Sequence, residues 1–95
     1  MIINASVQVV PLTEAQKAYS IIDQAIALIQ QSGLKYTVGA LATDIEGEYA
    51  AVQQLIAGIN DLCYSKNDTP FLIYTKLHLC GGKDIWADDK TAKFR

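Results

Sequence analysis

Two carboxylates and a hydroxyl lie close together in the short apolar stretch of residues 42–47, near the middle of the 95-residue chain. Side chains alternate between the faces of a β-strand, so we expect Asp44 and Glu46 on one face and Ile45 on the other. A buried carboxylate is costly unless it is paired, so this acidic face is predicted to meet water, a ligand or a partner subunit. Paired carboxylates can perform acid–base chemistry, but the spacing places no nucleophile or further acid beside them. We therefore interpret one as a ligand acceptor and the other as a surface charge.

The remaining reactive residue types give weaker signals. His78 is the only histidine, and a single strand histidine is more often structural or exposed than a catalytic base or metal ligand. Cys63 falls on the apolar stripe of a helix and is predicted to be a core residue. With Cys80 it makes two free thiols, as in a cytosolic protein, rather than a disulfide framework. Lys76 either binds an anion or protects a strand edge from pairing.

Composition limits the class of protein. The chain is 51% hydrophobic and 19% charged, which is typical of a small globular domain with one modest core. Its net charge of −2 argues against a nucleic-acid partner, which calls for a clustered basic surface. The first residues lack the features of a signal peptide, and no stretch approaches the roughly 20 apolar residues of a membrane span. We expect one cytoplasmic domain over residues 1–95, with no membrane contact, metal or cofactor.

The N-terminal third predicts a strand followed by a helix. Residues 2–10 alternate apolar and polar side chains, as in a half-buried strand, and Pro11 ends the run. Thr13 and Gln16 have the spacing of a capping box. Apolar side chains then recur at helical spacing as far as Gly33, where glycine favours a helix end.

The middle of the chain predicts two strands. Residues 34–43 contain β-formers, and Gly39 among them indicates a bulge or a close backbone approach. A tight reversal is expected near residues 42–43, and a short third strand over residues 43–47 ends at Gly47.

The C-terminal half predicts a helix, a strand and a tail. Helical spacing returns from Glu48, which is placed in the first turn to complement the helix dipole, with Lys66 near the last turn. Residues 71–79 form the last strand. Residues 81–95 are a polar tail with a short helix around residues 87–93.

The predicted order is β-α-β-β-α-β, which indicates an α+β, ferredoxin-like fold. Right-handed crossovers would place both helices on one face of a four-stranded antiparallel sheet. The other face stays uncovered. By strand alternation it carries Asn4, Ser6, Gln8, Asp44, Glu46, Tyr74, Lys76 and His78.

This open face also carries apolar side chains, among them Ile2, Val10 and Leu72. It is too apolar to meet only solvent, so self-association is predicted. Small-molecule sites often combine a few polar groups with aromatic walls at such interfaces.

Three motifs resemble the small YkoF-like thiamine-binding proteins. They are the strand end Val-Pro-Leu at residues 10–12, the helix exit Ser-Gly-Leu-x-Tyr at residues 32–36, and Thr-x-Ile-Glu-Gly at residues 43–47. The order and spacing match, and the resemblance covers roughly residues 2–80.

The resemblance implies assembly into dimers or tetramers through open sheet faces, binding of thiamine or its hydroxymethylpyrimidine half, and no established catalysis. Its motifs point to Thr43 and Glu46, and further to Ser6 and Gln8. An aminopyrimidine offers an amine and ring nitrogens to a carboxylate and hydroxyls, and a flat face to an aromatic ring such as Tyr74. The predicted ligand-binding residues are Ser6, Gln8, Thr43, Glu46, Tyr74 and Lys76.

The leading hypothesis is a non-enzymatic cytoplasmic protein that binds thiamine or a related pyrimidine on the open sheet face, near a subunit interface. The alternative is a homo-oligomeric interaction module with no small ligand. A third hypothesis is a small enzyme of the dimeric α+β barrel type that uses His78 or Glu46.

Overall fold

The first strand, β1 (Ile2–Pro11), shows how the sequence decides which side of the sheet is covered. In the computed structural model, which describes residues 1–95, Ile3, Ala5 and Val7 are buried, whereas the alternating residues Asn4 and Ser6 are only partly covered. The predicted period of two is confirmed. The apolar row faces the helices and the polar row faces away from them.

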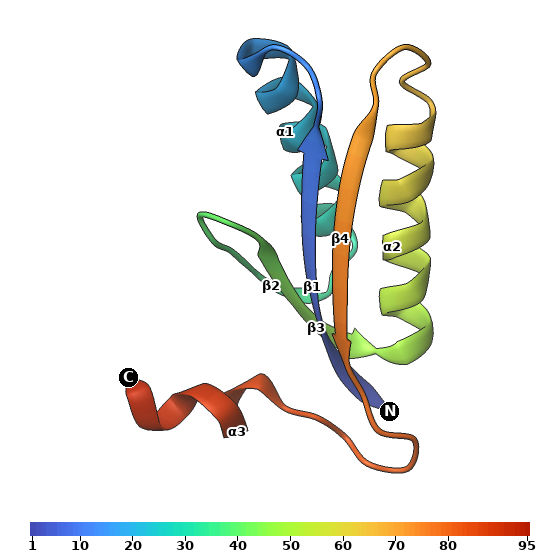
Figure 1. The fold of residues 1–95 in the computed structure, drawn as a ribbon. Helices are drawn as coiled ribbons and strands as arrows, with labels where there is room; N and C mark the ends of the chain where they lie inside the picture. Colours follow the sequence, from blue (N-terminus) through green and yellow to red (C-terminus); the bar gives the residue numbers. More distant parts are fainter.

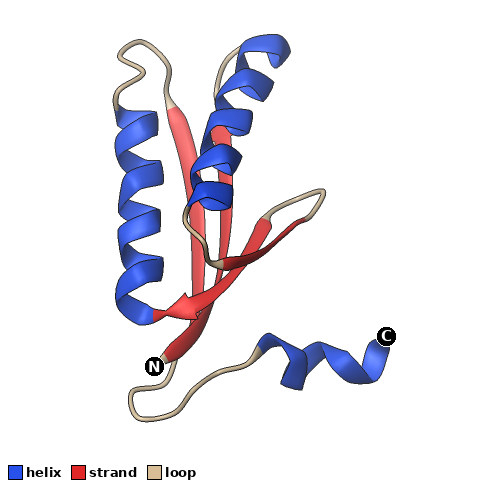
Figure 2. Ribbon diagram, turned by 180° about the vertical axis from the view of Figure 1, so that it is seen from behind, coloured by secondary structure: helices blue, strands red, loops and turns tan.

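Four antiparallel strands form one sheet in the order β2-β3-β1-β4. The other three strands are β2 (Lys35–Val38), β3 (Thr43–Glu48) and β4 (Phe71–His78). Two helices, α1 (Ala15–Gln31) and α2 (Tyr49–Tyr64), cover one face of the sheet, and the opposite face carries no long helix (Figures 1 and 2). The ferredoxin-like arrangement predicted from the sequence is confirmed. None of the helices has the length and hydropathy that crossing a membrane requires.

The core lies between the sheet and the two helices. Its largest fully buried side chains are Ile3 of β1, Ile45 of β3, and Val52 and Ile59 of α2. Cys63 belongs to the same cluster, as its position on the helix stripe predicted. These contacts fix the helices against β1 and β3, and therefore fix the register of the strands that form the open face.

The start of α1 differs from the prediction. Glu14, not Thr13, is the N-cap residue, and its carboxylate accepts hydrogen bonds from the backbone N–H groups of Gln16 and Lys17, at 3.0 and 2.6 Å. The capping box predicted for Thr13 and Gln16 is therefore wrong. The backbone N–H of Leu12 still bonds to the carbonyl of Pro70, so the chain leaves the sheet too late for Thr13 to cap the helix.

The hairpin between β2 and β3 reverses earlier than predicted. β2 ends at Val38 and the turn occupies residues 39–42, so a strand to residue 43 and a reversal at residues 42–43 are wrong. The N–H of Gly39 donates to the carbonyl of Ala42 at 3.0 Å. A Cβ atom at Gly39 would lie 2.9 Å from that carbonyl oxygen, which confirms the predicted close backbone approach.

The charges predicted within α2 lie just outside it. Glu48 occupies the N-cap position and makes no side-chain capping bond; its carboxylate instead accepts from the Met1 amine at 2.8 Å. This hydrogen bond raises the pKa of the amine. Lys66 follows the end of the helix and donates to the side chain of Gln24 at 2.9 Å. Neither charge is in a terminal turn.

The C-terminal segment adds a short helix, α3 (Ala87–Thr91), and a single 3₁₀ turn, η1 (Ala92–Phe94). The predicted short helix around residues 87–93 is confirmed. β4 ends at His78, one residue before the predicted end of the strand. The segment leaves β4 at the end of the sheet near the N-terminus and turns back toward β2, with the C-terminus standing apart from the body (Figure 1).

Candidate functional site

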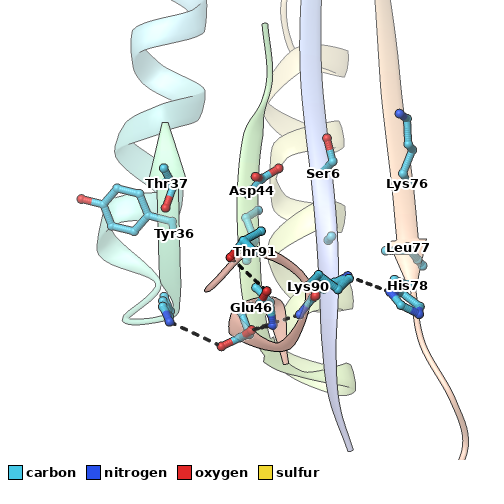
Figure 3. Close-up of a pocket in the computed structure, with 15 residues that line it drawn as sticks. Ser6, Tyr36, Thr37, Asp44, Glu46, Lys76, Leu77, His78, Lys90 and Thr91 are labelled. Atoms are coloured by element: carbon cyan, nitrogen blue, oxygen red, sulfur yellow. Dashed lines mark hydrogen bonds and ion pairs between the residues drawn. The ribbon is translucent and has the colours of Figure 1, made fainter. Parts of the chain in front are cut away.

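The strand register arranges the polar side chains of the open face into rows that cross the sheet. One row runs from Thr37 of β2 through Asp44 of β3 and Ser6 of β1 to Lys76 of β4, because each is the register partner of the next. Each of the four strands therefore contributes one side chain to this row, which we call the upper row. Figure 3 shows the four side chains side by side across the sheet.

A second row lies parallel to the first and two residues away on each strand. It is nearer to the end of the sheet where the chain begins. This lower row contains Lys35 of β2, Glu46 of β3, Asn4 of β1 and His78 of β4. The two rows together place two carboxylates, two hydroxyls, two lysine side chains, one imidazole and one amide on one face. Strand alternation predicted this face, including the position of Asp44 and Glu46 on the same side.

Glu46 is the most constrained side chain of the lower row, with only 10% of its side chain exposed. Its Oε2 accepts from Asn4 Nδ2 at 3.1 Å and from the backbone N–H of Ala87 at 2.6 Å. Its Oε1 lies 3.9 Å from the ammonium of Lys35. The carboxylate thus joins three strands to the C-terminal segment.

The C-terminal segment is bonded along the edge of this lower row. The backbone N–H of Ile85 donates to the carbonyl of Ile2 at 2.9 Å, and the N–H of Ile2 donates to the Asp84 carboxylate at 2.8 Å. Asn4 Nδ2 also donates to the carbonyl of Ile85 at 3.1 Å. These bonds lead the chain across the sheet, so that α3 stands beside Glu46 in front of the open face (Figure 3).

A final contact joins α3 to the far edge of the sheet. The ammonium of Lys90 lies 2.7 Å from Nδ1 of His78. An ammonium can only donate, so Nδ1 accepts and the neutral imidazole carries its proton on Nε2. The side chain of Lys90 thus reaches from α3 to β4.

The upper row and α3 border a cavity of about 450 Å³. This is within the range of roughly 300–1,000 Å³ that is usual for small-ligand pockets. The cavity is lined by the four residues of the upper row, which are Thr37, Asp44, Ser6 and Lys76. None of them forms a bond that holds the C-terminal segment. The lower row is thus largely occupied by the C-terminal segment, and the upper row is available to a ligand.

The six residues predicted for ligand binding lie in three places. Ser6, Glu46 and Lys76 line this cavity. Gln8 and Tyr74 face each other further along β1 and β4, outside it.

Thr43 is in a different place, with 6% of its surface exposed. It is three residues from Glu46 on the same strand, so the two side chains point to opposite faces. Thr43, together with Gln8, lines a smaller and mostly apolar cavity of about 230 Å³ between α1 and the β2–β3 hairpin.

Sequence reasoning missed Thr37, Lys90 and Thr91 among the residues that line the larger cavity. Alternation would have found Thr37 if the register of β2 had been known. No local pattern places Lys90, because its position depends on how the C-terminal segment crosses the sheet.

Neither cysteine belongs to this site. Cys63 and Cys80 are both free, as predicted. Burial raises the pKa of the Cys63 thiol, an effect that Lys66 partly offsets, so this thiol is a poor nucleophile at neutral pH. No group of three His, Cys, Asp or Glu side chains is arranged to hold a metal ion.

Comparison with known families gives a direct match. The family model described as "Thiamine-binding protein" matches residues 5–95. The chain belongs to the thiamine-binding protein family. The resemblance found in the three sequence motifs is therefore confirmed at the level of the family.

Three known proteins are similar to this chain over most of their length. A UPF0045 protein of Clostridium perfringens (strain 13 / Type A) is 25% identical over 92 residues, which covers 97% of this chain and 96% of the relative. A domain of unknown function, DUF77, from Bacillus cereus has a TM-score of 0.88 and 29% identity, covering 100% of this chain and 91% of that structure. A Thermotoga maritima protein, whose name proposes a role in thiamine biosynthesis or salvage, has a TM-score of 0.86 and 27% identity, with complete coverage of both chains.

Proposed function

We propose that this chain is a non-enzymatic small-molecule binding protein whose ligand is thiamine or the hydroxymethylpyrimidine part of thiamine. One observation carries the proposal. In a member of the thiamine-binding protein family, the Asp44 carboxylate forms no ion pair and stands between the hydroxyl-bearing residues Ser6 and Thr37 in a ligand-sized cavity. An aminopyrimidine presents an amine that donates to a carboxylate and ring nitrogens that accept from hydroxyls.

In this proposal the two carboxylates have different roles. Asp44 is the main acceptor for the ligand amine, because nothing in the chain neutralises it. Glu46 holds the C-terminal segment through Oε2, and only its Oε1 faces the ligand as a second acceptor. Ser6 fixes the orientation of the ring. Lys76 lies at the opposite end of the same row.

The Asp44→Asn variant is expected to bind thiamine about 10- to 100-fold more weakly than the wild-type chain. A hydrogen bond to a charged group contributes about 1.5–3 kcal/mol, and each 1.4 kcal/mol is about tenfold in affinity. Isothermal titration with thiamine, and with hydroxymethylpyrimidine in parallel, measures the change and shows which half of the vitamin is bound. Asp61→Asn, an equal charge change at an exposed position of α2, is the matched control.

The Thr43→Val variant separates the two cavities. It removes a hydroxyl from the cavity between α1 and the hairpin and leaves the open face unchanged. Weakened thiamine binding in Thr43→Val, with normal binding in Asp44→Asn, would contradict the site proposed here. It would place the ligand in the cavity between α1 and the β2–β3 hairpin instead.

We also propose that the protein assembles with itself into dimers or tetramers in the cytoplasm. Leu72 and Tyr74 are 46% and 55% exposed, and they lie on the same open face of β4 as Lys76. Exposed apolar side chains on an uncovered sheet face favour association. The two free cysteines agree with a reducing compartment.

Light scattering is expected to give a mass of at least two chains, and Tyr74→Asp is expected to lower it. A stable oligomer that gives no heat with either ligand would favour the alternative function, an interaction module without a small ligand. A monomer at all concentrations would contradict the assembly.

A further inference from the structure

We propose that the ligand of this site carries a phosphate monoester, and that Lys76, His78 and Lys90 bind the phosphate. This inference deepens the proposed function, because it specifies the class of ligand for the same cavity. It starts from the uneven distribution of charge across the upper and lower rows.

The two ends of the cavity have opposite charge. Asp44 lies on β3, whereas Lys76 lies on β4, two strands away across β1. Neighbouring strands are about 4.8 Å apart, so the acidic and basic ends are separated by about 10 Å of sheet. A ligand that spans this distance needs a donor at one end and an anion at the other.

The basic end has no counter-ion within the chain. The ion pairs of the structure involve the Met1 amine, Lys17, Lys35 and Arg95, and none involves Lys76 or Lys90. Both lysines nevertheless line the same cavity. Lys66, Lys83 and Lys93 also form no ion pair, but they lie outside this cavity.

The contact between Lys90 and His78 increases the number of donors at this end. Because Nδ1 of His78 accepts from the Lys90 ammonium at 2.7 Å, the imidazole keeps an N–H at Nε2. The Lys90 ammonium and the imidazole N–H supply two neighbouring donors. The exposed side chain of Lys76, whose ammonium points away from them in Figure 3, would turn toward the phosphate to supply a third donor to its acceptor oxygens.

Lys90 comes from α3 and the other donors come from the sheet, so the C-terminal segment would close the phosphate end of the site. The bonds that Ile85 and Ala87 make to Ile2 and Glu46 hold this segment in place. In thiamine the alcohol that carries a phosphate lies at the opposite end from the aminopyrimidine. The orientation with the amine at Asp44 therefore directs the phosphate toward Lys76 and Lys90.

Isothermal titration of the full chain with thiamine and with thiamine monophosphate tests the inference. We expect the phosphate ester to bind about tenfold more tightly at low salt, because two partly exposed cations each make a modest charge-assisted contact. The advantage is expected to shrink as salt screens the charges. Hydroxymethylpyrimidine phosphate, run in parallel, is expected to gain less if the phosphate needs the full length of the vitamin to reach Lys90.

Three lysine variants give the matched comparison. Lys76→Met and Lys90→Met are each expected to remove most of the tenfold preference, measured as the ratio of the affinities for thiamine monophosphate and thiamine. Lys93→Met makes the same charge change in the same C-terminal segment, outside the cavity, and is expected to keep the preference. Lys76→Met provides a second variant that leaves the contacts of α3 intact.

Three other outcomes would overturn the inference, and one of them would also overturn the proposed function. Equal affinity for thiamine and its phosphate would overturn the phosphate site and leave the proposed function standing. Binding of inorganic phosphate as tightly as the ester would overturn the assignment of an ester ligand. No binding of thiamine or of either ester would overturn the proposed function and this inference together.

Discussion

The Ile59→Ala variant is expected to lose about 2–5 kcal/mol of unfolding free energy. Ile59 is 0% exposed in α2 and belongs to the same core cluster as Ile3, Ile45 and Val52. Truncation removes buried methyl and methylene groups and leaves a cavity that the surrounding structure fills only in part. A small domain has a total stability of roughly 5–15 kcal/mol, so this single change removes a large share of it.

Urea denaturation followed by circular dichroism measures this effect. The midpoint is expected to fall while the slope of unfolding free energy against urea stays constant, which indicates a loss of stability and not of compactness. Ile59→Val is expected to cost an intermediate amount of about 0.5–1.5 kcal/mol.

Leu41→Ala provides the control for this core prediction. Leu41 is 82% exposed at the tip of the β2–β3 hairpin, so its truncation is expected to change the free energy by less than about 0.5 kcal/mol. A loss of less than about 1 kcal/mol in Ile59→Ala would show that the core repacks around α2 more freely than its contacts suggest.

The sequence predicted the fold well because the information that sets it is local and repeated. The alternation of β1 and the helical stripes of α1 and α2 predict which faces are buried. The core contains the apolar row of β1, four residues of the α2 stripe and Ala25 and Ile29 of α1, whereas Tyr49 at the start of the α2 stripe is 47% exposed. Once these faces are known, right-handed crossovers leave only a few arrangements of six elements, among them the ferredoxin-like one. The open face and the residues on it follow from the same alternation.

The predictions about the fold were wrong where several residues could satisfy the same backbone groups. Thr13 and Glu14 can each cap a helix, and the bond between Leu12 and Pro70 decides between them. The bond between Leu12 and Pro70 joins segments far apart in the sequence, so no local pattern reports where the chain leaves the sheet before the helix. The end of β2 at Val38 likewise depends on the contact between Gly39 and Ala42 across the hairpin.

The candidate site could be predicted only in part, for the same reason. Alternation places Asp44 and Glu46 on one face but cannot tell which carboxylate is occupied. The structure distinguishes them, because the backbone N–H of Ala87 bonds to Glu46 from a segment 41 residues away in the sequence. Thr43 was drawn into the predicted site by its motif, although its spacing from Glu46 places it on the other face of the sheet.

The second large effect is expected in Glu46→Gln, which should loosen the C-terminal segment. The carboxylate accepts from Asn4 and Ala87 through the same oxygen, Oε2, and a glutamine can keep its carbonyl oxygen at that position but loses the negative charge that strengthens both bonds. A charge-assisted hydrogen bond is roughly twice as strong as a neutral one. We therefore expect the free energy of opening of residues 84–91 to fall by about 1–2 kcal/mol, and their amide exchange to accelerate by about tenfold or more.

Hydrogen–deuterium exchange of the ligand-free protein measures this opening, and Asp44→Asn is the paired variant. Asp44 is on the same strand and face, but it makes no bond to the C-terminal segment, so exchange in that segment is expected to stay at the wild-type rate. For thiamine binding the opposite pattern is expected: Asp44→Asn should weaken binding more than Glu46→Gln, because Asp44 is the proposed acceptor for the ligand amine. If Glu46→Gln left the exchange of Ala87 unchanged, Glu46 would not hold the segment. Its carboxylate would then be as available to a ligand as that of Asp44, and the division of roles between the two acids would be wrong.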